Sequence, residues 1–256
     1  MKLHTQILGT GEDIVILHGF LGMGDNWRTL SKSFASEGYR VHTPDMRNHG
    51  KSPHKETFSY DDMAEDLKDY FSDHGITKAI LIGHSMGGKI AMFFATKYEY
   101  LIKKLIIVDI SPKAYKPHHD EILKSLADLK QQSLSSRKEA EIILKQHIDN
   151  NGLRLFLLKN LKRNTDNTLS IKPNIEAFTA NRHYIGEALP QSSHTKADTL
   201  FIKGGTSDYL NQSDELLIDQ HFTNAKITTI ENAGHWVHAE NPKAFFDIVI
   251  NFIKEQ

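Results

Sequence analysis

Short, continuous runs of apolar residues recur along the chain, with helical patterns between them. We expect strands at residues 14–17, 39–43, 79–82, 105–108, 199–202 and 227–230. Most of these runs are apolar throughout rather than alternating, which is typical of strands buried on both faces of a parallel sheet. Strands that alternate with helices predict βα units and therefore an α/β fold with a mostly parallel, doubly wound sheet.

Two helices are well defined by their patterns. After Ser59, apolar residues at positions 63, 67, 70 and 71 place one buried stripe on a helix over residues 59–72. Asn241 followed by Pro242 predicts an N-cap and the first helical position of a C-terminal helix.

Residues 113–195 interrupt the alternation, because they show helix signals and no expected strand. Ser136 with Glu139 forms a capping-box pattern, and Pro173 opens a second candidate helix. We therefore expect a single domain over residues 1–256, with a helical lid insertion at about 113–195 over one edge of the sheet. Adjacent His118 and His119 are expected on the surface of that insertion.

The composition excludes several classes of protein. The chain has 256 residues and no cysteine, which excludes a disulfide framework, Cys-ligated metal sites and a cysteine nucleophile. Its 31 Lys and Arg residues balance 32 Asp and Glu residues, whereas a nucleic-acid binder usually carries a basic excess. No apolar run approaches the ~18 residues of a membrane span, and residues 1–6 lack the apolar core of a secretory signal. We expect a soluble, cytoplasmic monomer or homodimer without a nucleic-acid partner.

The most informative motif is Gly-His-Ser-Met-Gly-Gly at residues 83–88. It follows one expected strand and precedes an apolar helix at 89–97, which is the setting of a G-x-S-x-G nucleophile elbow. A turn this tight strains Ser85 and leaves room only for glycine two residues to either side. The helix behind the serine offers backbone N–H groups to a developing oxyanion.

The same residues permit a second interpretation. Gly83, Gly88 and Lys89 have the spacing of a phosphate-binding loop, G-x-x-x-x-G-K-[ST]. That motif needs a hydroxyl at the next position to reach Mg²⁺, and position 90 is Ile. The elbow is therefore favoured.

A base and an acid complete the predicted catalytic set. His235 follows the last expected strand, and the order for this fold is serine, acid, histidine. Asp109 and Asp208 both follow strands between Ser85 and His235. The commonest arrangement favours Asp208, but the residues alone do not choose between them. His238 lies three residues after His235, and the pair could be interpreted as a metal site. Because Glu240 is the sole nearby carboxylate and the sequence offers no second cluster, no metal is expected.

Two further loops adjoin the expected site. The loop that begins at His18 follows the first expected strand and is placed to supply a backbone N–H from Phe20, which would act with that of Met86 as an oxyanion hole. Asp45 and Arg47 follow the second expected strand, where we expect a structural, hydrogen-bonded loop.

On these segments the chain resembles the α/β-hydrolase superfamily over essentially its whole length. It resembles YbfF-like serine esterases more narrowly, through Asp-Asn-Trp at 25–27, Asp-Met-Arg-Asn-His-Gly at 45–50, Val-Asp-Ile-Ser-Pro at 108–112 and Gly-His-Trp-Val-His-Ala-Glu at 234–240. In those esterases the catalytic aspartate lies in the D-I-x-P segment. The resemblance therefore implies Asp109, and Asp208 beside it leaves room for a shared role.

The resulting hypothesis is a serine hydrolase without a cofactor that cleaves small-molecule carboxylic esters or thioesters through an acyl-enzyme on Ser85. The alternatives are a C–C bond hydrolase or a menaquinone-pathway lyase on the same scaffold, since fold alone does not determine chemistry. A non-catalytic small-molecule receptor is a third possibility.

Overall fold

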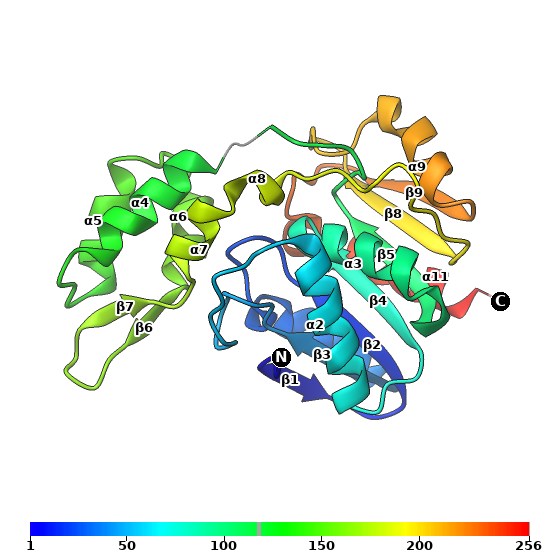
Figure 1. Cartoon of the computed structure of the whole chain (residues 1–256), viewed down its shortest axis with the longest axis horizontal. Coiled ribbons are helices and arrows are strands. Elements are labelled where there is room, and N and C mark those ends of the chain that lie inside the picture. The colour runs from blue at the N-terminus through cyan, green and yellow to red at the C-terminus, as the bar shows by residue number, and fades with distance from the viewer. Residues whose placement is uncertain (117–118, 256) are drawn as a thin grey trace.

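A seven-stranded sheet forms the centre of the molecule in the computed structural model, which describes residues 1–116 and 119–255 (Figure 1). Its strands lie in the order β1–β3–β2–β4–β5–β8–β9. Their bounds are Thr5–Leu8 (β1), Glu12–Leu17 (β2), Tyr39–Pro44 (β3), Ala79–His84 (β4), Ile102–Val108 (β5), Thr199–Gly204 (β8) and Ala225–Ile230 (β9). Every neighbouring pair is parallel except β1 with β3. The predicted α/β fold with a mostly parallel sheet is confirmed.

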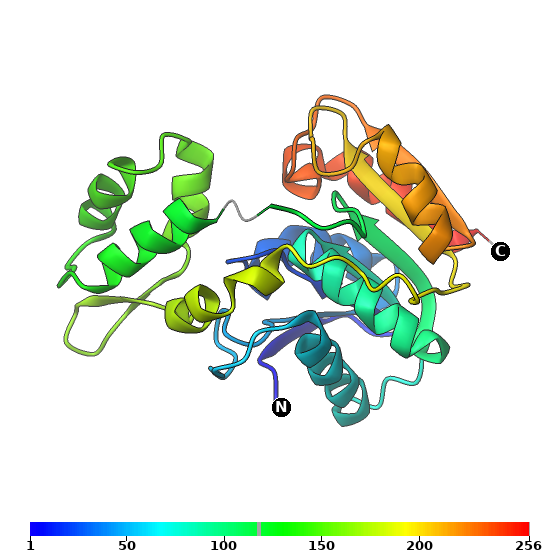
Figure 2. The ribbon, with the colours of Figure 1, turned by 45° about the horizontal axis from the view of Figure 1, so that its top comes forward.

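Helices cover both faces of the sheet (Figure 2). One face packs against α1 (Arg28–Ser36) and α11 (Pro242–Lys254), and the other against α2 (Tyr60–Asp73), α3 (Met86–Lys97) and α9 (Glu215–His221). Successive side chains of β2 point to opposite faces, so that Ile14 and Ile16 enter the first core and Val15 and Leu17 the second. This two-sided burial is the reason that the strand sequences are continuously apolar.

The sequence did not predict β1. Its residues are half-buried or exposed, and it pairs with only one neighbour, antiparallel to β3. A short edge strand of this kind carries little apolar signal because it has no fully buried face. Four further short helices complete the body: Gly24–Trp27 (η1), Glu99–Leu101 (η2), Gln212–Asp214 (η3) and Val237–Glu240 (α10).

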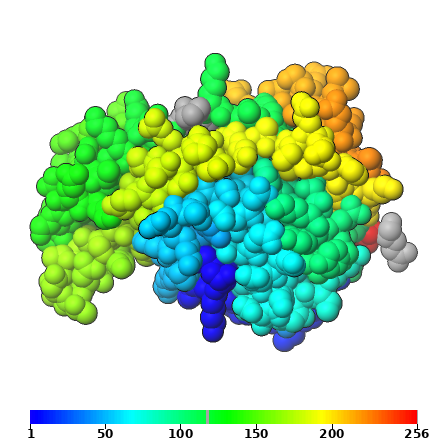
Figure 3. All heavy atoms as spheres, in the orientation of Figure 1, coloured from blue at the N-terminus to red at the C-terminus, as the bar shows by residue number. Residues whose placement is uncertain are grey.

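The segment between β5 and β8 forms a group of helices beside the sheet, and Figure 3 shows it filling one end of the molecule. The helices are Asp120–Lys130 (α4), Arg137–Lys145 (α5), Asn151–Leu158 (α6), Ile175–Ala180 (α7) and Arg182–Ile185 (α8). The expectation that it contains no strand is wrong, because Leu161–Arg163 (β6) and Leu169–Ile171 (β7) form an antiparallel hairpin. Each of these strands has three residues, too few for a recognisable pattern. His118 lies outside the described residues.

Two chain segments connect this insertion to the body. Tyr115 donates a backbone hydrogen bond to the carbonyl of Gly186 (2.8 Å), and Leu189 donates one to Pro112 (2.9 Å). The hydroxyl of Tyr60 on α2 donates to the carbonyl of Ile185 (2.6 Å). The outgoing and returning segments are therefore joined to each other and to the body.

Capping residues set the starts of several helices. The Asn241 side chain accepts a hydrogen bond from the N–H of Ala244, as its sequence pattern predicts. The Ser59 hydroxyl accepts one from the N–H of Asp62, so that the helix expected over 59–72 begins at Tyr60. Ser136 caps α5 in the same way. Pro173 does not open α7, since Asn174 provides the cap and the helix begins at Ile175.

The loop after β3 is held by a buried carboxylate. Asp45 accepts hydrogen bonds from the backbone N–H groups of Gly24 (2.7 Å) and Lys51 (2.8 Å). Gly24 begins η1 after β2, and Lys51 lies in the loop after β3, so Asp45 ties these two connections together.

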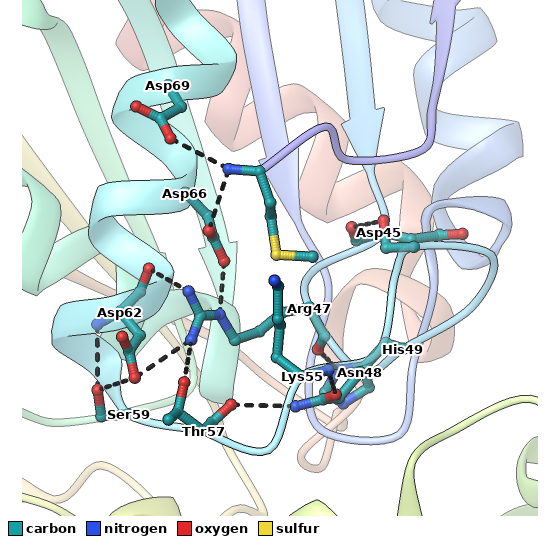
Figure 4. A network of polar contacts seen from close by, with 12 residues as sticks. Asp45, Arg47, Asn48, His49, Lys55, Thr57, Ser59, Asp62, Asp66 and Asp69 are labelled. Carbon is teal, nitrogen blue, oxygen red and sulfur yellow. Dashed lines mark hydrogen bonds and ion pairs between the residues drawn. The ribbon is translucent and has the colours of Figure 1, made fainter.

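Arg47 in the same loop is the centre of a buried polar network (Figure 4). Its Nε lies 2.6 Å from Asp66, and its other nitrogens donate to the hydroxyl of Thr57 (2.8 Å) and the carbonyl of Asp62 (3.1 Å). Asp66 also faces the Met1 amine at 3.5 Å. Arg47 therefore links the loop to α2, and its role is structural, as the sequence indicated.

Replacing Arg47 with methionine should lower the free energy of unfolding by about 3–5 kcal/mol, because it removes one partner of a buried ion pair and leaves the Asp66 carboxylate under-compensated. Urea unfolding measures this loss. Lys97→Met is the matched control, since Lys97 forms a largely exposed pair with Asp61, which should cost less than about 1 kcal/mol. Equal losses in the two variants would contradict the structural role of Arg47.

Candidate active site

Ser85 lies at a sharp turn between β4, which ends at His84, and α3, which begins at Met86. Its backbone φ is 53°, in the left-handed region that disfavours residues with a side chain. A Cβ at Gly83 would overlap the carbonyl of Gly87, and one at Gly87 would overlap the carbonyl of Leu17. Both glycines are therefore needed for the turn to form, and the serine occupies the strained position between them.

His235 and Asp109 are in direct contact. The distance from His235 Nδ1 to Asp109 Oδ2 is 2.7 Å. Asp109 follows β5 with a φ of 50° and is fully buried. Its Oδ1 accepts the N–H of Gly204 (2.9 Å), and its Oδ2 also accepts the hydroxyl of Ser207. Three donors thus converge on one buried carboxylate and fix its orientation toward the imidazole.

Asp208, the other candidate acid, is exposed on the loop after β8. The acidic side chain that is hydrogen-bonded to His235 belongs to Asp109, from the neighbouring strand. Of the two aspartates that the sequence left open, the structure brings Asp109 to the histidine.

Buried imidazoles surround His235. His84 Nε2 donates to the carbonyl of His235 (2.8 Å), and burial, reinforced by the neighbouring His238 and His235, holds the pKa of His84 well below its usual value. The ring of His238 stacks on Trp27 with centroids 4.1 Å apart, and burial lowers the pKa of His238 to about 3. Both imidazoles are therefore neutral at neutral pH, and they add no positive charge next to His235.

The loop after β2 runs beside the nucleophile. A Cβ at Gly19 would lie 3.4 Å from that of Ser85. The His18 ring fixes the loop, because its Nδ1 donates to the carbonyl of Gly19 (2.8 Å) and its Nε2 accepts the N–H of Met46 (3.0 Å). Burial lowers the pKa of His18, which agrees with a neutral ring that donates on one side and accepts on the other.

The two residues of the predicted oxyanion hole lie on this side of the site. Phe20 belongs to the loop after β2 and lines the cavity described next. Met86 is the first residue of α3, and its side chain is buried in the core. The backbone N–H groups at a helix N-terminus have no partner within the helix, so they are available to an anion.

A cavity of about 360 Å³ opens onto Ser85 and His235. Its walls come from both the body and the insertion: His18, Gly19, Phe20, Gly22, Asn26, Trp27, His84, Ser85, His119, Ile122, Leu153, Phe156, Tyr209, His235, Trp236 and His238. None of these described lining residues is Lys, Arg, Asp or Glu. His119, expected on the outer surface of the insertion, lines the cavity instead, and its ring lies 4.9 Å from that of Phe20.

The phosphate-loop interpretation conflicts with the position of Lys89. Its side chain is buried, and Nζ donates to the carbonyl of Lys113 (2.6 Å). Burial lowers the pKa of Lys89 to about 7, whereas a phosphate-binding lysine needs a charged, accessible head group. Lys89 connects α3 to the start of the insertion.

Sequence reasoning missed two residues that contact the candidate catalytic groups. Ser207 donates to Asp109, and the ring of Tyr209 stacks on His235 with centroids 3.8 Å apart. Both lie in the loop after β8, where the notable sequence feature was Asp208. No pattern in that loop indicates which side chains turn inward.

Residues 1–116 and 119–255 contain neither a cluster of metal ligands nor a membrane-spanning helix. No group of three or more His, Asp or Glu side chains in these ranges is arranged to hold a metal ion. No helix in them is both long and apolar enough to span a membrane.

A strained serine between a parallel strand and a helix shares a cavity with a histidine that is hydrogen-bonded to a buried aspartate, and this combination defines the class of protein. The family model for the alpha/beta hydrolase fold matches residues 14–242, and the chain belongs to this family. Within it the chain is YbfF-like, as the sequence motifs indicated. It is 34% identical over 246 residues to esterase YbfF of Escherichia coli (strain K12), covering 94% of this chain and 93% of that protein.

Other relatives have related activities. The sn-1-specific diacylglycerol lipase ABHD11 of Mus musculus is 35% identical, with 94% of this chain and 80% of that protein covered. A solved structure described as a marine microorganism esterase superposes with a TM-score of 0.93 at 38% identity, covering 98% of this chain and 99% of that one. These relatives support assignment of the chain as a hydrolase of the esterase and lipase type.

Proposed function

We propose that this chain is a serine esterase that hydrolyses uncharged carboxylic esters or thioesters through an acyl-enzyme on Ser85. The observation that carries the proposal is the 2.7 Å contact between His235 and the buried Asp109, at a cavity that Ser85 also lines. Nucleophile, acid and base follow one another along the chain in the order of this family.

In the proposed mechanism, Ser85 Oγ attacks the acyl carbon while His235 Nε2 takes the hydroxyl proton. Asp109 holds the imidazole in the required tautomer, with the proton on Nδ1, and stabilises the imidazolium that forms. The backbone N–H groups of Phe20 and Met86 receive the oxyanion. His235 then returns the proton to the leaving alcohol or thiol as its bond to the acyl carbon breaks.

The second half of the reaction releases the acid. Water attacks the acyl carbon of the ester on Ser85, with His235 again acting as the base, and the bond to Ser85 Oγ breaks. The protonated histidine returns its proton to that oxygen, so that the enzyme is regenerated. No step uses a metal or an organic cofactor.

The cavity supports an uncharged, apolar acyl group. Its walls are mostly aromatic and aliphatic side chains together with the neutral imidazoles of His18, His84 and His238. None of the described lining residues is Lys, Arg, Asp or Glu. Four of the described lining residues belong to the insertion: His119 just before α4, Ile122 on α4, and Leu153 and Phe156 on α6. We propose that residues 113–195 act as a lid of a single domain that shields the acyl-enzyme from bulk water.

Treatment with a fluorophosphonate, followed by intact and peptide mass spectrometry, tests the proposal without presuming a substrate. One adduct on Ser85 is expected in the wild-type protein, and His235→Ala should abolish it because the serine loses its base. Asp208→Asn is the control, because that residue is exposed whereas the carboxylate hydrogen-bonded to His235 is that of Asp109, and this variant should label normally.

Two results would contradict the proposal. Absence of an adduct in the folded wild-type protein would favour a non-catalytic receptor. Turnover of ketone or diketone substrates in preference to simple esters would favour a C–C bond hydrolase or lyase on the same scaffold.

A further inference from the structure

The loop after β8 places an aromatic ring flat against the candidate base. The rings of Tyr209 and His235 are nearly parallel, at 18°, with centroids 3.8 Å apart. The other aromatic neighbours of this ring are tilted and more distant, His84 at 4.8 Å and 44° and Trp236 at 6.1 Å and 58°. The imidazole is therefore covered on one face by Tyr209 and held at its Nδ1 edge by Asp109.

The backbone of Tyr209 is fixed on both sides. Its N–H donates to the hydroxyl of Ser207 (3.3 Å), which itself donates to Asp109. Its carbonyl accepts the hydroxyl of Tyr115 (2.6 Å), and the same oxygen of Tyr115 accepts the N–H of Ser111 (2.8 Å). The backbone of Tyr209 thus belongs to the same hydrogen-bonded assembly as the acid, and this backbone carries the stacked ring.

An aromatic ring in this position affects charge as well as geometry. The face of a tyrosine ring is electron-rich and attracts a cation within about 6 Å of its centroid. In the proposed mechanism the imidazole becomes a cation only when it takes the proton of Ser85, so this attraction is larger in the transition state than in the resting enzyme. A contact of this kind lowers the barrier rather than tightening substrate binding.

We propose that Tyr209 is a positioning residue for the reaction, which holds the His235 imidazole against Asp109 by stacking and favours its protonated form through the face of the ring. This inference rests on the proposed function. The other titratable groups that face the imidazole are Asp109 at the end of β5, His84 at the end of β4 and His238 on α10.

Comparison of Tyr209→Phe with Tyr209→Leu tests the inference, because both variants lack the hydroxyl and both cover the imidazole, but only one keeps an aromatic face. We expect kcat for a neutral p-nitrophenyl ester to be roughly 3- to 30-fold lower in the leucine variant than in the phenylalanine variant, with little change in KM. The acidic limb of the pH profile of kcat/KM should move to lower pH by roughly half a unit or more, since the imidazolium is less favoured.

Two further variants serve as controls. Tyr100→Leu removes an exposed tyrosine on η2, at the opposite ends of the strands, and should leave the profile unchanged. Tyr209→Met provides a second non-aromatic side chain if the leucine variant does not fold.

The outcomes separate this inference from the proposed function. Equal kcat values and equal pH profiles for the phenylalanine and leucine variants would overturn the role of Tyr209. A loss confined to KM would also overturn it, because it would identify the ring as a substrate contact only. Failure of the wild-type protein to hydrolyse esters or to be labelled at Ser85 would instead overturn the proposed function.

Discussion

Ser85→Ala is expected to lower kcat for ester hydrolysis by about 10⁴-fold or more, since the variant keeps the cavity and the backbone donors but has no nucleophile. The residual rate would come from substrate binding and oxyanion stabilisation alone. Initial-rate kinetics with a chromogenic ester measure the change, and enzyme prepared in the absence of other esterases is essential for a loss of this size.

Two controls accompany this measurement. Ser36→Ala removes an exposed serine at the end of α1 and should leave kcat near the wild-type value. Circular dichroism should show that the Ser85→Ala variant is folded, because alanine differs from serine at this position only by the hydroxyl. A folded variant that keeps near wild-type turnover would overturn the assignment of the nucleophile.

The sequence was sufficient to predict the central sheet because its strands are buried on both faces. Residues 79–82 place alternate apolar side chains in the cores on the two faces of the sheet, which an interior strand buried on both faces can do. The strands that were missed lack this constraint. β1 is a half-exposed edge, and β6 and β7 have three residues each with Lys162 and Arg163 in solvent.

The parts of the candidate site differ in how far local sequence determines them. Ser85 is constrained by its own turn, because the flanking glycines and the strand and helix on either side are adjacent in the chain. Asp109 and Asp208 have similar local surroundings, each following a strand. The side chain that reaches the imidazole depends on backbone direction, and the positive φ of Asp109 is not visible in the sequence.

Contacts between distant loops are the least predictable part. Ser207 and Tyr209 reach the site because the loop after β8 folds back toward the end of β5, and Tyr115 at the start of the insertion supports it. The sequence shows that these residues lie in connections, but it contains no information on how close two connections approach. The same limit applies to His119, which reached the cavity rather than the outer surface.

Asp109→Asn is expected to lower kcat by about 10³–10⁴-fold, because it reverses the hydrogen bond that sets the tautomer of His235. The backbone N–H of Gly204 fixes an oxygen on one side of the residue, so the amide nitrogen would face Ser207 and His235. An amide N–H there donates to Nδ1 and leaves the proton on Nε2. A histidine in that tautomer cannot take the proton of Ser85.

Asp208→Asn is the matched comparison, because it makes the same chemical change on an exposed residue one strand away and should leave kcat near the wild-type value. Parallel kcat measurements at saturating ester decide between the two acids. A larger loss for Asp208→Asn would overturn the assignment of Asp109. Similar partial losses in both variants would mean that the acid role is shared. The structure argues against sharing, because Asp208 is exposed whereas three donors converge on the buried carboxylate of Asp109.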